Sequence, residues 1–448
     1  MQNQGSVEPA HRLTADGRRY FAFTALNITS VALISRDLIA LLSVRLGAGP
    51  FLLGAINSLS YFTFGMIPLG RLFIDQRRPV RHMVVQWRLR YLSLSLAALA
   101  LFGAPLLPGD AALAIYFVGL LGFFVAKGFG MTARGPIVGH VSDGGDRESF
   151  LSRVQLVSAT VQIVARLGVA LLLGADASRM RFAIVLLVAV AIGSVGSFFL
   201  ARVSEPSEGE GRRAPRSVAP RQLIAVARRL PRLLSYVVIW AALSGIQLPF
   251  IVLFFRSLGG LGDNGIMLGT AFGSVIALAP LVAARRWMAT SGAGRFLTIA
   301  AIALVLASGM MLALGLTQAL PRGLLLAVVA FGLFRSGQEI VLVAGDSYLL
   351  DSVERQDRLD AGMIYQVLRG VAGVVGSFGG GAIMSALDAS GRLDDNARFA
   401  VLWSLTLVLG LCLVVVSWTM HRTRHTGGPA TVANADLSST HHTPRSQS

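Results

Sequence analysis

Nine charged side chains lie inside long apolar runs of this chain. They are six cations and three anions: Arg36, Lys127, Arg134, Arg166, Arg335 and Arg369, against Asp37, Glu339 and Asp346. Charges inside a hydrocarbon layer are costly, so they normally face a bundle interior or a wet cavity, where they handle solutes or protons. A guanidinium matches carboxylate and phosphate groups bidentately. The excess of cations therefore favours a site for an organic anion.

The densest stretch is Phe331–Arg369, where one apolar segment carries Arg335, Gln338, Glu339 and Asp346. Offsets of 4 and 7 residues place the three charged side chains on one helical face. Arg335 and Glu339 can therefore pair within the helix. Glu339 is the best candidate for a proton carrier, because burial and a nearby guanidinium act oppositely on its proton affinity. The alternative is a fixed ion pair that holds the bundle together.

Arg36 and Asp37 are adjacent in the first apolar run. Neighbouring residues point about 100° apart on a helix, so these two cannot form a clean pair with each other. Each is expected to face a different partner, and one of them to face the pathway: Arg36 for an anionic group, or Asp37 for a proton. The alternative is that both pair with charges on neighbouring helices and lock one conformation.

Lys127 and Arg134 are seven residues apart and so share a helical face, and Gly135-Pro136 should kink that helix. Together with the residues above, they form the predicted substrate-binding set: Arg36, Lys127, Arg134, Arg166, Arg335, Gln338 and Arg369. The alternative is that several of these cations lie at wet cavity ends or reach to the membrane interface.

The composition places these residues in membrane helices. The 448 residues are 54% hydrophobic and 14% charged, against roughly 25% charged in soluble proteins. The apolar runs are long and lack the alternation of strands, which predicts an all-α membrane protein with twelve transmembrane helices in two pseudo-symmetric six-helix bundles. The runs are 20–45, 50–74, 82–107, 111–136, 150–174, 180–202, 232–257, 263–284, 295–318, 322–349, 360–387 and 397–420.

The arginines predict the orientation. Twelve spans put both termini on one side, and most Arg lie on that side, Arg88 and Arg90 being counted there with the span ends. The seven Arg on the outer side are Arg45, Arg179, Arg181, Arg256, Arg322, Arg392 and Arg398. We therefore expect a multi-pass protein of the bacterial cytoplasmic membrane with both termini in the cytoplasm.

The predicted organisation has five parts. Residues 1–19 form a cytoplasmic segment, 20–203 the first bundle, 204–230 a cytoplasmic linker, 231–421 the second bundle, and 422–448 a disordered cytoplasmic tail. Within the linker, Pro220–Leu230 is either an amphipathic helix on the membrane surface or a plain solvated segment.

The two halves resemble each other at an offset of 211 residues, where Asp146-Arg147 matches Asp357-Arg358. Parallel repeats of this kind are typical of transporters that rock two bundles about a central site. The short charged loops are interpreted as clasps that close the cytoplasmic gate, or alternatively as solvated turns. The predicted gating residues are Asp75, Arg77, Asp146, Arg147, Asp346, Asp357 and Arg358.

In this architecture the chain resembles the major facilitator superfamily. The family's loop between spans two and three has a Gly, three residues, an Asp and then basic residues. Here "GRLFIDQRRPVR" holds Gly70, Asp75, Arg77 and Arg78, with the Gly displaced by one position. In the second half, "RSGQE" (Arg335–Glu339) is similar to the family's Arg-x-x-Gln element of span four. The Gly-Pro pair of drug/proton antiporters is absent from span five. The resemblance implies a secondary transporter with no cofactor.

Other classes have little support in the sequence. The basic residues lie between apolar runs, which disfavours nucleic-acid binding. The single cysteine, Cys412, permits no disulfide within the chain, and no metal constellation, catalytic triad or phosphate loop is present. We expect a monomer that contacts membrane lipids and moves a small molecule, with proton coupling as an option. The alternatives are a non-transporting membrane scaffold or assembly factor on the same fold, or a lipid or drug exporter.

Overall fold

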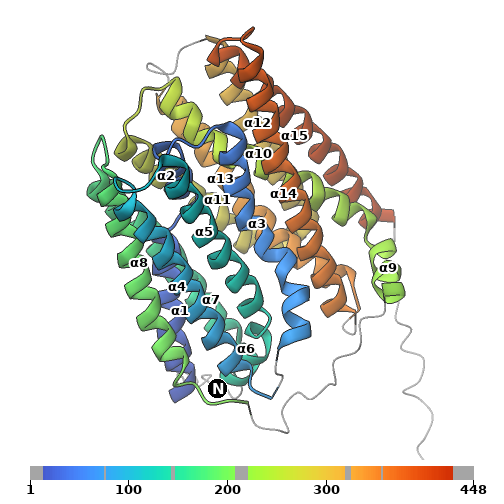
Figure 1. Cartoon of the computed structure of the whole chain (residues 1–448). Helices are drawn as coiled ribbons and strands as arrows, with labels where there is room; N and C mark the ends of the chain where they lie inside the picture. The colour runs from blue at the N-terminus through green and yellow to red at the C-terminus, as the bar shows by residue number, and fades with distance from the viewer. Residues whose placement is uncertain are drawn as a thin grey trace, which may run out of the picture.

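The computed structural model describes residues 14–74, 77–142, 147–206, 220–317, 324–354 and 357–426. Within these ranges the chain is helical and contains no strand. Most of the predicted tail, most of the N-terminal segment and the middle of the linker lie outside the described residues. Figure 1 shows long helices lying side by side, with the N-terminal half on one side and the C-terminal half on the other.

The helix bounds follow the apolar runs closely. The N-terminal half contains α1 (Ala15–Leu33), α2 (Arg36–Arg45), α3 (Pro50–Phe73), α4 (Pro79–Gly103), α5 (Gly109–Met131), α6 (Arg134–Ser142), α7 (Arg147–Leu173) and α8 (Arg179–Leu200). The linker forms α9 (Pro220–Arg229). The C-terminal half contains α10 (Pro231–Ser257), α11 (Asp263–Ser291), α12 (Ala293–Thr317), α13 (Leu324–Ser352), α14 (Arg358–Ser390) and α15 (Asp395–Thr426).

Among the described residues, nine segments are long and apolar enough to cross a membrane, α1 and α2 counting as one. Shorter apolar stretches occur in α7 and α11. Helix α4 is not among the nine, and it carries Arg81, Arg88 and Arg90. The chain is therefore an all-α, multi-pass membrane protein, while the count of twelve crossings stays a prediction.

Two predicted runs are each divided into two helices. The first run breaks at Ile34, and the Ser35 hydroxyl accepts a 3.2 Å hydrogen bond from the amide of Leu38, which starts α2. The fourth run breaks between Met131 and Arg134, just before the predicted kink at Gly135-Pro136. A continuous apolar composition does not reveal the first break, because its cause is a single capping hydroxyl.

The two halves are in contact along two helix pairs, and the internal repeat relates one pair to the other. Helix α3 packs along α14, and α7 packs along α11. At the offset of 211 residues, α3 corresponds to α11 and α7 to α14, so the two contacts are pseudo-symmetric equivalents. This arrangement confirms the two pseudo-symmetric bundles.

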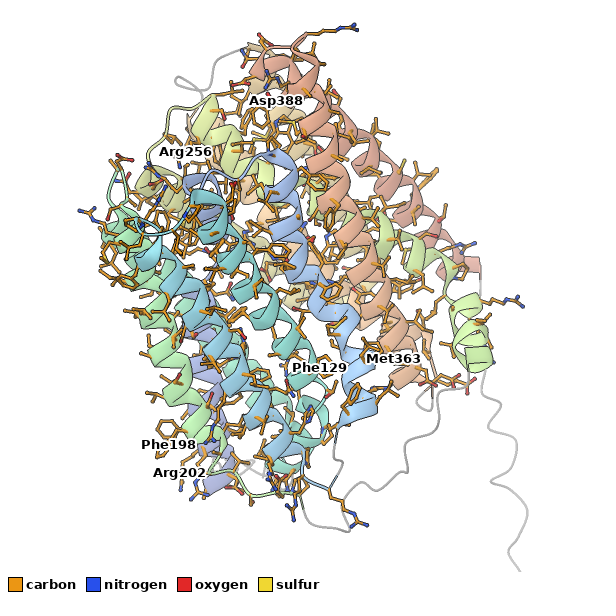
Figure 2. All side chains as sticks on the ribbon, viewed as in Figure 1. Phe129, Phe198, Arg202, Arg256, Met363 and Asp388 are labelled. Atoms are coloured by element: carbon orange, nitrogen blue, oxygen red, sulfur yellow. The ribbon has the colours of Figure 1, made fainter. Side chains whose placement is uncertain are left out.

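We call the side on which α1 begins the N-terminal face and the other side the opposite face. Helix α9 lies at the N-terminal face, at the bottom of Figure 1, and the ends of α2 and α10 lie at the opposite face. Arg202 and Met363 mark the N-terminal face in Figure 2, whereas Arg256 and Asp388 mark the opposite face.

Glycines allow α14 to approach α3 closely. A Cβ at Gly54 would overlap the carbonyl oxygen of Ser377, and one at Gly373 would overlap the ring of Tyr61. A different glycine of α14, Gly376, meets the backbone of α10. Small residues on two faces of α14 thus allow its backbone to contact both its own half and the other half. Close contacts of this kind are typical of helix packing in membranes.

We predict that Gly54→Ala destabilises the contact between the halves by about 1–3 kcal/mol, because the added methyl meets backbone that cannot rotate away. The control is Gly65→Ala on the same helix, where a Cβ meets nothing within 4 Å. That change should stabilise α3 by up to about 1 kcal/mol. The melting temperature of the purified protein in detergent measures both, and equal shifts would contradict the packing argument.

Candidate substrate cavity

A cavity of about 410 Å³ lies between the two halves. Its described lining comes from α1 to α5, α7, α10, α13 and α14, with Arg134 of α6 at its edge. The charged lining residues are seven cations and one carboxylate: Arg36, Arg90, Lys127, Arg134, Arg166, Arg335 and Arg369, and Glu339. Every member of the predicted substrate-binding set lines this cavity, including Gln338.

The cavity extends to the N-terminal face. Its lining includes Met131 at the end of α5 and Arg134 at the start of α6, and Arg134 is exposed. Toward the opposite face the lining stops at Ser35 and Leu248, beyond which Leu38, Leu42 and other apolar side chains are fully buried. The cavity therefore reaches the N-terminal face and is closed off from the opposite face.

The opposite face is closed by Asp263, whose side chain is 1% exposed. Its carboxylate pairs with Arg45 at 2.8 Å and Arg256 at 3.1 Å, and accepts a hydrogen bond from the amide of Ala177 at 3.0 Å. Arg45 and Ala177 belong to the N-terminal half, and Asp263 and Arg256 to the C-terminal half. A backbone hydrogen bond from Asp263 to Ala175, 2.9 Å, completes the closure.

Arg36 and Arg369 stack on aromatic rings that line the cavity. The Arg36 guanidinium carbon lies 4.5 Å from the centroid of Tyr61. The Arg369 guanidinium carbon lies 4.3 Å from Phe64 and 5.0 Å from Trp240. Stacking holds each guanidinium plane in place while its edge remains available for an anion.

Arg90 also lines the cavity, although the sequence pattern did not predict it as a site residue. Its assignment to the cytoplasmic end of a span is wrong. Its side chain is fully buried, and it donates to the Asn27 side-chain oxygen at 3.1 Å and stacks 4.2 Å from Phe123. It lies eleven residues into α4, about 16 Å from the helix start. A count of basic residues cannot find it, but its spacing from Trp87 on one helical face is a usable signal.

Asp37 and Arg335 form an ion pair between the halves. The carboxylate is 1% exposed, and its oxygen lies 3.3 Å from the guanidinium. The intrahelical pairing of Arg335 with Glu339, considered from the spacing, is therefore replaced by a partner on α2. Glu339 lines the cavity and makes no ion pair within the described part of the chain.

Arg166 and Gln338 are held by hydroxyl groups. Arg166 donates to Ser274 of α11, and so connects α7 with the other half. Gln338 donates to Ser244 of α10. Arg166 lies within electrostatic range of both members of the Asp37–Arg335 pair and of Glu339.

The predicted gating residues lie at or near the N-terminal face where they are described. Asp75 and Asp146 and the side chain of Arg147 lie outside the described residues. Arg77 and Asp346 are exposed. Asp357 pairs with Arg229 of α9 at 3.2 Å, and Arg358 donates to the Leu350 carbonyl at 3.1 Å. These two contacts join the linker and the C-terminal half only, so a clasp between the halves stays a prediction.

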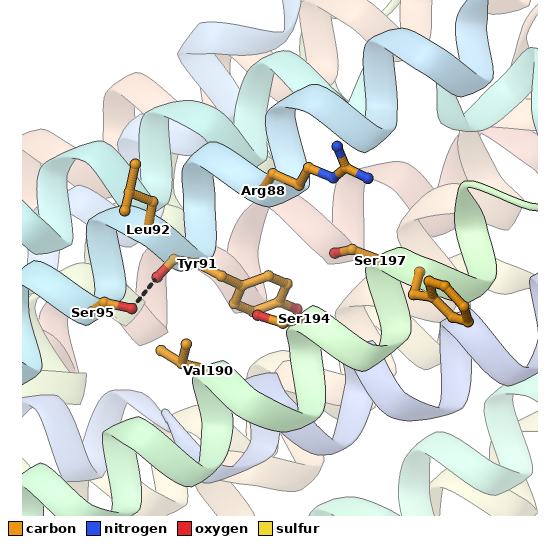
Figure 3. Close-up of a pocket in the computed structure, with 8 residues that line it drawn as sticks. Arg88, Tyr91, Leu92, Ser95, Val190, Ser194 and Ser197 are labelled. Carbon is orange, nitrogen blue, oxygen red and sulfur yellow. Dashed lines mark hydrogen bonds between the residues drawn. The ribbon is translucent and has the colours of Figure 1, made fainter.

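A second groove of about 340 Å³ lies between α4 and α8 (Figure 3), and it shares no lining residue with the central cavity. Arg88, Tyr91 and Ser194 line it, and Arg88 is exposed. Arg88 and Arg90 are two positions apart and so point to nearly opposite sides of α4. One arginine therefore faces the outer surface of the bundle, and the other faces the cavity.

We predict that Asp263→Asn lowers the free energy of unfolding by about 2 kcal/mol, because Arg256 loses its counter-charge and Arg45 keeps its pair only with the exposed Asp176 among the described residues. Asp388→Asn is the control at the same face, since that carboxylate is 54% exposed in its pair with Arg398. The control should change stability by less than about 1 kcal/mol. Thermal unfolding in detergent compares them, and a silent Asp263→Asn would contradict a closing role.

We predict strong coupling between Asp37 and Arg335 in a double-mutant cycle with Asp37→Asn and Arg335→Gln. Each single change leaves one buried charge alone, so the double variant should lose about 1–3 kcal/mol less than the sum. A parallel cycle of Arg335→Gln with Glu339→Gln should couple by less than about 0.5 kcal/mol. Chemical unfolding in detergent measures both, and additivity in the first cycle would show that the pair is not formed.

Comparisons with known proteins identify solved structures that have the same fold. Neither protein-family models nor curated sequences match the chain. The solved structure of the nucleoside transporter NupG is 13% identical, with a TM-score of 0.64 over 92% of this chain and 99% of that one. A bacterial homologue of the iron transporter ferroportin, in an inward-facing state, is 15% identical, with a TM-score of 0.66 over 91% and 99%. A D-xylose-proton symporter is 13% identical, with a TM-score of 0.64 over 89% and 96%. The chain therefore has the fold of the major facilitator superfamily.

Proposed function

We propose that this protein is a secondary active transporter of a small organic anion. The observation that carries the proposal is the cavity between the halves, whose described lining holds seven cations and one carboxylate. Solved structures with this fold include transporters of nucleosides and of D-xylose with protons, which supports transport as the general activity.

The charge balance supports an anionic substrate. Guanidinium groups withdrawn from water are unfavourable unless an anion, a carboxylate or water compensates them. Glu339 alone cannot balance the lining cations, and Asp37 is already occupied by Arg335. A volume of about 410 Å³ matches a small solute. A bound organic anion supplies the missing charge.

Transport proceeds by alternating access. The structure is open at the N-terminal face, which the Arg distribution makes the cytoplasmic side, and closed at the opposite face by Asp263. Rocking the halves about α3–α14 and α7–α11 separates Asp263 from Arg45 and closes the N-terminal face. The charged loops at that face, including Asp357 and Arg358, then serve as its gate.

Proton coupling runs through Glu339 or Asp37. Glu339 faces the cavity without an ion pair in the described residues, so a proton and an anion can bind there together. Asp37 holds Arg335 across the halves at 3.3 Å, so a proton on Asp37 weakens that link. Symport or antiport then follows from which state releases the proton.

The cavity weighs against a non-transporting scaffold on this fold. A scaffold needs only a packed centre, whereas here buried cations surround open volume. A lipid exporter would require a cavity open sideways to the membrane. The lining of this cavity instead extends to the N-terminal face, where Arg134 is exposed.

We predict that reconstituted vesicles take up an organic anion faster when a pH gradient is imposed. Arg335→Gln should abolish the flux, and Glu339→Gln should remove the acceleration by the gradient while leaving exchange. Asp110→Asn, at an exposed position outside the cavity, is the control and should transport normally. Flux that ignores the gradient rejects the coupling, and flux that survives Arg335→Gln makes that residue structural.

A further inference from the structure

Six of the seven cavity cations fall into two groups that differ in their counter-charges, and the seventh, Arg134, is exposed and in electrostatic range of Asp346. Lys127 lies within electrostatic range of Arg36, Arg90 and Arg369, and no carboxylate is among these neighbours. We call these four residues the acid-free cluster. Two carboxylates of the described residues come near it: Asp37, which follows Arg36 in the chain, is paired with Arg335, and Asp346 is in range of Arg369; neither lines the cavity.

The second group is balanced. Arg166 lies in electrostatic range of Arg335, Asp37 and Glu339, and Arg335 pairs with Asp37. Two cations thus face two anions, and the Asp37–Arg335 ion pair and the Arg166–Ser274 hydrogen bond already satisfy part of this group. The uncompensated charge of the cavity is therefore concentrated in the acid-free cluster.

Three buried donor atoms without partners belong to the acid-free cluster, and Arg166 and Arg335 of the second group have one each. Arg90 is fully buried, and its Nε and one terminal nitrogen have no hydrogen-bond partner in the described structure. Nε of Arg369 is likewise buried and unpartnered. A buried donor without a hydrogen bond costs free energy, so these donors indicate where an acceptor is missing.

The aromatic rings determine how these donors are presented. Phe123 lies under Arg90, Tyr61 under Arg36, and Phe64 and Trp240 beside Arg369, at 4.2–5.0 Å from the guanidinium carbons. The rings do not use the N–H groups as hydrogen-bond partners, so Nε and one terminal nitrogen of Arg90 and Nε of Arg369 stay available. Arg36 is also the first residue of α2, so the positive end of that helix dipole adds to the cluster.

We propose that the acid-free cluster binds a substrate head group that carries two negative charges, a phosphate monoester or a dicarboxylate, and that Arg90 determines this specificity. The proposal rests on the proposed function. A single negative charge would leave most of the cluster uncompensated in a low-dielectric cavity, whereas a dianion offers several oxygens to the free donors. Because Arg369 lies on the C-terminal half and the other three cations on the N-terminal half, the bound head group bridges the halves.

The test measures binding to the purified full-length protein by quenching of tryptophan fluorescence, since Trp87 and Trp240 line the cavity. The probes are phenyl phosphate, benzene-1,2-dicarboxylate, benzoate and benzyl alcohol. We expect at least one dianion to bind about tenfold or more tightly than benzoate, and benzyl alcohol not to bind. The first two probes distinguish a phosphate from a dicarboxylate head group.

Arg90→Gln should weaken the preferred dianion by about tenfold or more and leave benzoate nearly unchanged, because the second charge loses its partner. Arg88→Gln is the matched control on the same helix, facing the outer groove, and should leave all affinities unchanged. If Arg90→Gln does not fold, Lys127→Met provides the same comparison. Equal binding of benzoate and the dianions, no binding of either dianion at millimolar concentration, or an Arg90 variant with wild-type selectivity overturns the proposal.

Flux measurements separate this proposal from the proposed function. Vesicle uptake of benzoate without a preference for either dianion rejects the dianion site but leaves an organic-anion transporter. Selective dianion binding that is never accompanied by flux supports the site and rejects transport.

Discussion

The structure depends on one constraint: guanidinium groups inside a membrane protein must be compensated by anions, aromatic faces or water. Each solution occurs here at a different place. Asp263 neutralises Arg45 and Arg256 at the opposite face, and Asp37 neutralises Arg335 between the halves. Arg36, Arg90 and Arg369 lie against aromatic rings of the cavity instead, and the proposed anion would supply their counter-charge.

The helix contacts are compatible with the proposed rocking of the two halves. Glycines at Gly54 and Gly373 bring α3 and α14 to backbone distance, and such small-residue contacts carry little side-chain interlock. Closure at the opposite face instead uses ion pairs and a few backbone hydrogen bonds around Asp263. Directional polar contacts can be broken and remade as discrete events, while the glycine contact supplies a continuous packing surface about which the halves can rock.

The fold and most of the charged lining of the cavity were predictable from the sequence. All seven predicted substrate-binding residues line the cavity, because a charge in an apolar run has few favourable places. Arg90 was not predicted, because Arg81 and Arg88 lie near it in the sequence and all three resemble the basic residues that mark the cytoplasmic side. Arg90 differs from Arg88 in the side of α4 that it faces. The partner of Arg335 also escaped, because helical spacing shows Glu339 one turn away but cannot show Asp37 on another helix.

The sequence by itself determined the helical membrane architecture, the two related halves and the excess of buried cations, since these follow from local hydropathy and composition. Only the tertiary structure decided the break before Arg36, the pairing of Asp37 with Arg335, the closure by Asp263 and the separation of an acid-free cluster from a balanced one. The physical reason is the distance along the chain over which each property is decided. Hydropathy acts over one helix, whereas charge pairing depends on which helices lie within a few ångströms of each other after packing.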